Sequence, residues 1–171
     1  MKRLILSALF ATACIITATA QKFALVDMEY ISRQIPAFAQ ANRQMEALSK
    51  EWQSLIDAKA EEAKKLYEEY QRTADKLTAA QRTAKEEAIV AKEKEAAGLR
   101  QQYFGPQGEM AKKQKELLGP LQDDIYNAVK AIAAERGYDA VIDRASAQSM
   151  IFASPRIDIS NDVLARLGYS E

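Results

Sequence analysis

The long segment 37–136 constrains the fold most, because it is rich in Ala, Glu, Lys, Gln, Leu and Arg, as long helices and coiled coils are. Apolar or small residues recur there in alternating steps of three and four, at Phe38, Ala41, Met45, Leu48, Trp52 and Leu55. The stripe skips Lys59 and resumes at Ala63, Leu66, Tyr70, Ala74 and Leu77. This narrow stripe with polar flanks predicts a coiled-coil seam rather than the face of a globular core.

A second stripe predicts that the helix folds back on itself. It contains Ala88, Lys92, Ala96, Leu99 and Tyr103, and after an interruption Leu121, Ile125, Ala128 and Ile132. The turn has two candidate positions: the breaker pair Gly105-Pro106, and Thr78, which with Gln81 fits a capping box. A turn at Gly105 leaves arms of roughly 69 and 28 residues, whereas one at Thr78 leaves roughly 40 and 58. The second pair matches better along its length, so we place the tip near residues 76–80.

Two Gly-Pro pairs then fall inside the returning arm, Gly105-Pro106 and Gly119-Pro120. Such pairs kink or locally unwind a helix. The alternative is that both are breakers tolerated near solvent.

The two ends of the chain have a different pattern. Residues 22–27 and 138–143 predict short strands, and residues 149–153 predict a third, joined to the second through the polar turn 144–148. Residues 28–35 predict a short helix, and Ser160 is expected to cap a last helix that Gly168 ends. Pro36 is expected in the first turn of the long helix, and Gly137 as the cap that ends the helical segment after Arg136. Together these patterns predict an α+β, mostly α chain. Residues 21–36 and 137–171 form a small β-sheet body, from which residues 37–136 project as a long antiparallel helical hairpin.

A body of about 50 residues with three short strands is too small to be comfortably stable alone. Its strand edges also need covering. The sequence therefore predicts self-association through the body strands, although it does not fix the number of subunits. The candidate association residues are Phe23, Leu25, Val141, Ile142, Ile151 and Phe152.

Residues 1–20 have the pattern of a cleavable export signal. Lys2 and Arg3 precede an apolar run from Leu4 to Ile16, and Ala18-Thr19-Ala20 gives the small residues that a signal peptidase reads. The run is shorter than the ~20 residues of a spanning helix, so we expect cleavage after Ala20 and no membrane span in the exported chain. Lipidation at Cys14 is not expected, because Ile15 and Ile16 continue the apolar run.

The residue types argue against an enzyme. The sequence has no histidine, and its one cysteine, Cys14, lies in the expected signal. Histidine- and thiol-based catalysis and most zinc sites are thereby excluded. Asp27, Asp139 and Asp143 are expected to be strand-end and turn residues. We expect no metal, cofactor or catalytic residue, and the balanced charge gives no reason to expect a nucleic acid.

Several segments resemble the Skp/OmpH family of periplasmic chaperones, and the resemblance covers nearly all of the exported chain. They are the opening strand 23–28, the segments 125–130 and 137–143, and the closing segment 157–164. The resemblance implies a jellyfish-like homotrimer, with a β body and three helical tentacles. It also implies a periplasmic, ATP-independent holdase whose partners are unfolded outer-membrane β-barrel proteins. Contact with a membrane surface stays open.

This chain departs from the basic tentacles of that family, because residues 37–136 hold 17 basic and 17 acidic residues. Long-range attraction of acidic clients should therefore be weak. The candidate client-binding residues are Tyr67, Tyr70, Tyr103, Phe104 and Met110, with Trp52 a weaker candidate. Each of them can instead simply pack its own hairpin. The alternative function is that of a periplasmic coiled-coil spacer or adaptor between membrane complexes.

Overall fold

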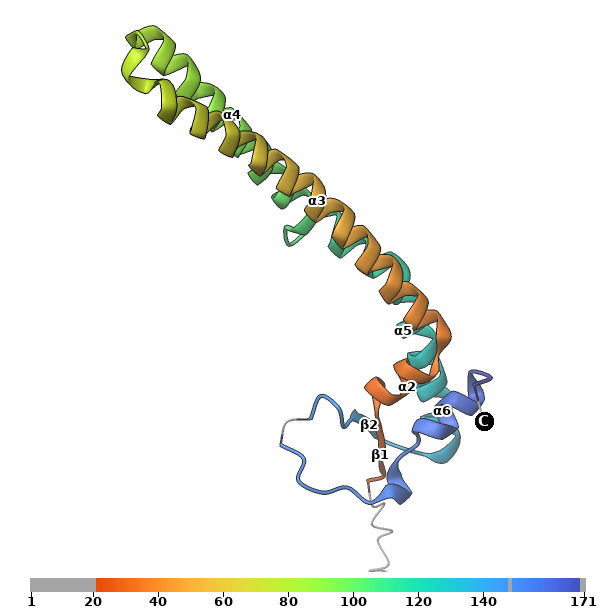
Figure 1. The fold of residues 1–171 in the computed structure, drawn as a ribbon. Helices are drawn as coiled ribbons and strands as arrows, with labels where there is room; N and C mark the ends of the chain where they lie inside the picture. The colour runs from red at the N-terminus through yellow and green to blue at the C-terminus, as the bar shows by residue number, and fades with distance from the viewer. Residues whose placement is uncertain (1–20, 148, 170–171) are drawn as a thin grey trace, which may run out of the picture.

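The structure, a computed structural model, describes residues 21–147 and 149–169. The expected export signal and its cleavage position therefore lie outside the described residues. Figure 1 shows a long arm of antiparallel helices that projects from a small body, and the body contains both ends of the described chain. The predicted class, mostly helical with a long hairpin on a small sheet, is confirmed.

The arm consists of one unbroken helix and two that run back beside it. Helix α3 spans Pro36–Thr73, α4 spans Ala79–Phe104 and α5 spans Glu109–Arg136. Helix α3 packs against α4 in the part of the arm far from the body, and against α5 near the body (Figure 1). Pro36 occupies the first turn of α3, where its missing N–H costs no hydrogen bond.

The arm turns through a 3-10 helix, Ala74–Lys76, and the extended residue Leu77. Thr78 then caps α4 with the predicted capping box. Its Oγ1 accepts from the N–H of Gln81 at 3.3 Å, and Gln81 Oε1 accepts from the N–H of Thr78 at 3.0 Å. The reciprocal bonds satisfy two backbone donors that the start of a helix otherwise leaves free.

The seam between the arms differs from the predicted stripe at two positions. Leu55 is 45% exposed, whereas Ile56 is fully buried. Ala88 is exposed, whereas Ile89 is buried. The predictions for Leu55 and Ala88 are wrong because a straight helix drifts by ~20° per heptad against a strict seven-residue repeat.

The two Gly-Pro pairs behave differently. The chain leaves the helix at Gly105, turns through a Gly108 N–H to Gly105 carbonyl bond of 2.9 Å, and enters α5 at Glu109. Pro120 lies within α5, which remains helical around it. The first pair is thus a local unwinding and the second is a tolerated breaker.

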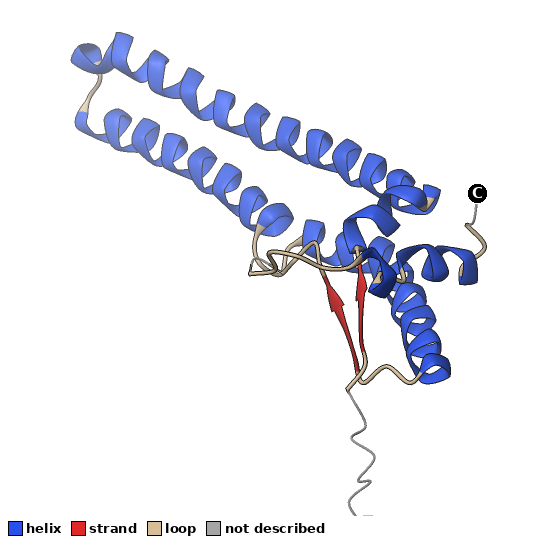
Figure 2. Cartoon of the chain, turned by 90° about the horizontal axis from the view of Figure 1, so that it is seen from below, coloured by secondary structure: helices blue, strands red, loops and turns tan. Residues whose placement is uncertain are grey.

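The body contains a two-stranded parallel sheet, whose strands lie side by side in Figure 2. Strand β1, Phe23–Val26, pairs with β2, Ala140–Asp143, with Phe23 opposite Ala140 and Val26 opposite Asp143. The prediction of a third strand at 149–153 is wrong, since these residues form an extended loop. Within one chain the other edge of β1 is met by Asp158, which lies opposite Leu25 in a single parallel bridge. The Ile159 N–H donates to the Leu25 carbonyl at 2.9 Å.

The core lies where the body meets the base of the arm. Two short helices, α2 (Met28–Gln34) and α6 (Ser160–Arg166), close it, and Ile31, Ile125, Ile132, Ile159 and Val163 are buried in it. Gly137 ends α5 in the left-handed region with a φ of 68°, as predicted for a glycine cap.

Ser160 does not cap the last helix as predicted, because it already belongs to α6, which Ile159 precedes as N-cap. Its hydroxyl accepts from the Asp27 N–H at 2.8 Å and donates to Asp158 at 2.6 Å. The serine thus joins the end of β1 to the start of α6.

Candidate functional site

Two parts of the molecule have exposed apolar side chains that its own fold does not use, and the arm is the first. Tyr67 on α3 is 49% exposed. It borders an open groove of about 390 Å³ between α3 and α4, whose floor is lined by Ala60, Ala63, Ala96 and Ala97. Small side chains at the seam leave this space, so Tyr67 is available for contact with another molecule.

An aromatic cluster lies further down the arm, where α4 ends. The Trp52 and Tyr103 rings are stacked, with centroids 4.8 Å apart and planes 9° apart. Phe104 meets Trp52 edge-on at 6.2 Å. Trp52 is only 9% exposed, whereas Phe104 is 36% exposed. Tyr103 therefore packs its own hairpin, and Phe104 both packs and remains accessible.

Tyr70 also lies between the arms. Its hydroxyl donates to the Glu86 carboxylate of α4, and this bond raises the pKa of Tyr70 above its usual range. The residues directly before these two, Glu69 and Lys85, also pair, at 2.7 Å. Tyr70 joins the arms rather than facing solvent, while Met110, in the first turn of α5, is half-buried.

Lys59 and Lys92, the two charges that interrupt the predicted stripes, belong to one ionic layer. Lys59 lies 3.1 Å from Glu62 and 3.8 Å from Glu95, and Lys92 lies 3.1 Å from Glu62 and 3.0 Å from Glu95. Hydrogen bonds from Lys92 and Lys59 lower the pKa of Glu62, and those to Glu95 and Glu62 raise the pKa of Lys92. The seam at this level thus combines solvated ion pairs with the small apolar side chains of Ala63 and Ala96.

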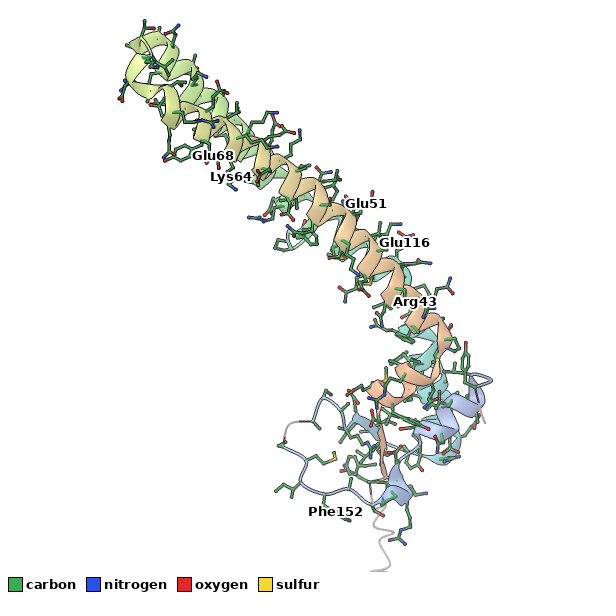
Figure 3. The ribbon with its side chains drawn as sticks, in the orientation of Figure 1. Arg43, Glu51, Lys64, Glu68, Glu116 and Phe152 are labelled. Atoms are coloured by element: carbon green, nitrogen blue, oxygen red, sulfur yellow. The ribbon has the colours of Figure 1, made fainter. Side chains whose placement is uncertain are left out.

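Figure 3 shows other charged side chains, among them Arg43, Glu51, Lys64, Glu68 and Glu116, distributed along the whole length of the arm. Residues of both signs occur along it, 17 basic and 17 acidic between positions 37 and 136. This arrangement agrees with the balanced composition of the segment and gives the arm no single-sign field.

The second exposed apolar region is on the body. Ile151 is fully exposed and Phe152 is 83% exposed, both on the loop that follows β2 (Figure 3). Phe23 and Ile142, one from each strand, are 45% and 42% exposed. So many large apolar side chains on a small body indicate an interaction surface.

The other two candidate association residues lie inside. Leu25 is 3% exposed and Val141 packs against the core of its own chain. Leu25 therefore offers no side-chain surface to a second molecule.

Asp27, Asp139 and Asp143 have structural bonds of their own. The Asp27 carboxylate caps α2 by accepting from the Tyr30 N–H at 2.8 Å, and it accepts from Arg144 at 2.9 and 3.1 Å. The Tyr30 N–H first, and then Arg144, lower the pKa of Asp27. Asp143 accepts from the Met28 N–H, and Asp139 accepts from the Lys22 N–H.

In the part of the chain that the structure describes, no three His, Cys, Asp or Glu side chains gather as a metal ligand set would. Nor does any helix in residues 21–147 and 149–169 have the length and apolar character needed to cross a membrane.

Known proteins resemble this chain over almost its full length. Residues 22–167 match the family described as outer membrane protein (OmpH-like). The chaperone protein Skp of Yersinia enterocolitica is 28% identical over 169 residues, covering 98% of this chain and 99% of that protein. Skp of Photorhabdus luminescens is 29% identical over 146 residues, covering 84% of this chain and 87% of its own.

The fold also has a solved counterpart. A crystal structure from Caulobacter crescentus, described as an OmpH-like outer membrane chaperone, superposes with a TM-score of 0.64 at 9% identity. The superposition covers 87% of this chain and 85% of that one. At this identity the likeness concerns the fold alone.

Proposed function

The chain belongs to the OmpH-like family of outer membrane proteins, and we propose that it is a periplasmic holdase chaperone for unfolded outer-membrane β-barrel proteins. The observation that carries the proposal is the extent of the match, which spans body and arm together and includes relatives named as chaperones. The protein acts by binding, without ATP and without a chemical step. Residues 1–20 direct it to the periplasm and are removed after Ala20.

Three copies associate through their bodies into a jellyfish-like homotrimer, and the arms enclose a cavity. The exposed side chains of Ile151, Phe152, Phe23 and Ile142 support this association, because a partner would remove them from water. The loop 149–153, which pairs with no strand of its own chain, then pairs with a strand of a neighbouring body. The number three rests on the family resemblance.

Clients contact the arms through many weak, unspecific contacts, which together give high avidity. Tyr67, Phe104 and Met110 are the contact residues that the structure leaves accessible. Tyr70 and Tyr103, also candidates by sequence, are engaged within the hairpin.

A spacer or adaptor between membrane complexes is the second candidate, and the unbroken helix α3 is the observation that favours it. A spacer should be stiff and its seam continuously filled. The break at Gly105, the ionic layer and the alanine-lined groove agree better with an arm that adapts to varied clients.

Client contact is tested by diluting a urea-unfolded outer-membrane β-barrel into the protein and following light scattering. Tyr67→Ala should lower protection by roughly twofold, since each of many contacts contributes little. Tyr169→Ala is the matched control, a tyrosine 40% exposed on the body, and should leave protection unchanged. Equal protection by all three proteins would remove Tyr67 from the client surface.

Association is tested by the native mass of Ile151→Ser/Phe152→Ser. We expect this variant to be monomeric. The matched control, Leu55→Ser, changes an exposed apolar residue of the arm and should keep the native mass of the wild type. An oligomer that survives the body substitutions would place the interface elsewhere.

A further inference from the structure

Trp52 is the only tryptophan of the chain, and the arm hides it. Most of the seam consists of small, charged or half-exposed side chains, so a ring of this size is exceptional there. What covers it is aromatic, namely the Tyr103 ring stacked on its face and the Phe104 ring against it edge-on. We refer to Tyr103 and Phe104 together as the aromatic cover.

The aromatic cover lies at the break between the two helices of the returning arm. Tyr103 and Phe104 are the last two residues of α4, immediately before the chain leaves the helix at Gly105. Helix α5 begins after Gly108 without any side-chain cap. The last turn of α4 therefore lacks helical continuation, and such ends fray at low cost in free energy.

The backbone at both ends of this break approaches the preceding helix so closely that only glycine fits there. A Cβ on Gly105 would lie 2.3 Å from the Gln101 carbonyl oxygen, and one on Gly108 would lie 2.7 Å from that of Gln102. Neither approach is sterically allowed, so no larger residue fits this backbone. The unwinding beside the aromatic cover is thus built into the sequence.

Trp52 itself is on the other arm, in the middle of the unbroken helix α3. Fraying of the last turn of α4 moves the aromatic cover without moving Trp52. The face released is one that already binds a flat ring in parallel stacking. Because the Tyr103 ring is stacked on this face, another aromatic side chain could bind there in the same way.

We propose that the aromatic cover is an autoinhibitory contact, which clients displace by stacking their own aromatic side chains on Trp52. This inference rests on the proposed holdase function and extends it. Trp52 becomes a client site only when α4 frays at its end, whereas Tyr67 is open at all times. The device keeps a large aromatic surface hidden from solvent, and from other copies, until a client is present.

The test combines binding with fluorescence, using a urea-unfolded outer-membrane β-barrel in which every tryptophan is replaced by phenylalanine. Trp52 is then the only tryptophan in the mixture. In the free protein, Tyr103→Ala should raise acrylamide quenching of Trp52, and Tyr103→Phe should not. Client affinity should rise roughly two- to tenfold in Tyr103→Ala, the range expected for one lost aromatic pair.

A double-mutant cycle separates this device from plain packing. In a Trp52→Leu background, Tyr103→Ala should no longer raise client affinity, because the face it uncovers is gone. Tyr103→Leu keeps apolar packing and removes only the stacked ring, so it serves if Tyr103→Ala fails to fold. It too should increase the quenching of Trp52 and the client affinity, by a smaller factor.

The outcomes distinguish this inference from the function on which it rests. If the wild type binds no client, both fail. If it binds client while Tyr103→Ala and Tyr103→Leu bind equally or more weakly, the cover is ordinary packing and the holdase function stands.

Discussion

Asp27 shows how one side chain can organise a junction in so small a body. It caps α2, binds Arg144 at the end of β2, and offers its own N–H to Ser160. Arg144 in turn reaches Asp158 at 3.4 Å. A single carboxylate thus connects segments from both ends of the chain.

Asp27→Ala should lower the free energy of unfolding by about 1–2 kcal/mol, mostly through the lost cap. Asp27→Asn is the matched control, since it keeps a capping oxygen and loses only the charge, and it should cost less. Urea unfolding followed by circular dichroism at pH 7 measures both. If Asn were as damaging as Ala, the ion pair with Arg144 would matter more than the cap.

The Asp27 carboxylate should also make the free energy of unfolding depend on pH. Its folded pKa lies below its ordinary value of 3.8, so its stabilising contribution is present above that value and is lost as the pH falls through the folded pKa. The stability difference between wild type and Asp27→Ala should therefore be constant down to about pH 4 and shrink below it.

At this scale, most residues with a local signal were predictable. Thr78 with Gln81, Pro36 and Gly137 act within a few residues of the chain, and they have the expected roles. Ser160 differs, because its hydroxyl bonds to Asp27 and Asp158 instead of capping α6. Leu55 was not predictable, because a one-position difference from Ile56 depends on how far the seam has drifted along the helix.

At the scale of the elements, residues of the two arms that lie equally far from the turn in the sequence contact each other. Trp52 and Tyr103 lie 25 and 26 residues from Leu77, on either side of the turn, and they stack. Glu69 and Lys85 lie eight residues from it on either side, and they pair. Once the turn is placed, residues at equal distances from it are candidates for contact, and this rule would have found both the aromatic cluster and the ionic layer.

The ionic layer should make the arm sensitive to salt. Because its side chains are solvated, 1 M NaCl should screen them and speed the amide hydrogen exchange of residues 59–62 and 92–95. The double variant Lys59→Met/Lys92→Met, which replaces the lysines by apolar side chains of similar length, should lose this sensitivity. Equal salt effects in both proteins would show that the layer does not hold the arms together.

Two glycines of the returning arm should respond to alanine in opposite ways. Gly98 lies inside α4 with open space around its missing Cβ, so Gly98→Ala should stabilise the helix by about 0.5–1 kcal/mol. Gly105→Ala should destabilise the arm, because its Cβ would overlap the Gln101 carbonyl. Thermal unfolding compares them, and a stabilising Gly105→Ala would mean that the break is not required by sterics.

At the scale of the whole molecule, the sequence predicted the hairpin and the small body but erred on the third strand. Ile151 and Phe152 have the pattern of a strand, yet in the single chain they pair with no strand. Their side chains remain in solvent instead. A strand pattern in the sequence does not show whether the strand would pair within its own chain or with another molecule.

Removing the end of the arm should separate the two roles of the molecule. Deletion of residues 67–88 takes away the turn with Tyr67 and Tyr70, and leaves the body and the aromatic cluster intact. We expect the native mass to stay that of the same oligomer and client protection to fall. Full protection by the shortened protein would show that clients do not need the distal arm.

The most direct test of the account is the native mass of the exported protein, alone and mixed with a urea-unfolded outer-membrane β-barrel. We predict a trimer that gains the mass of one client when the two are mixed. A monomer or dimer whose mass does not change on addition of the client would contradict the account.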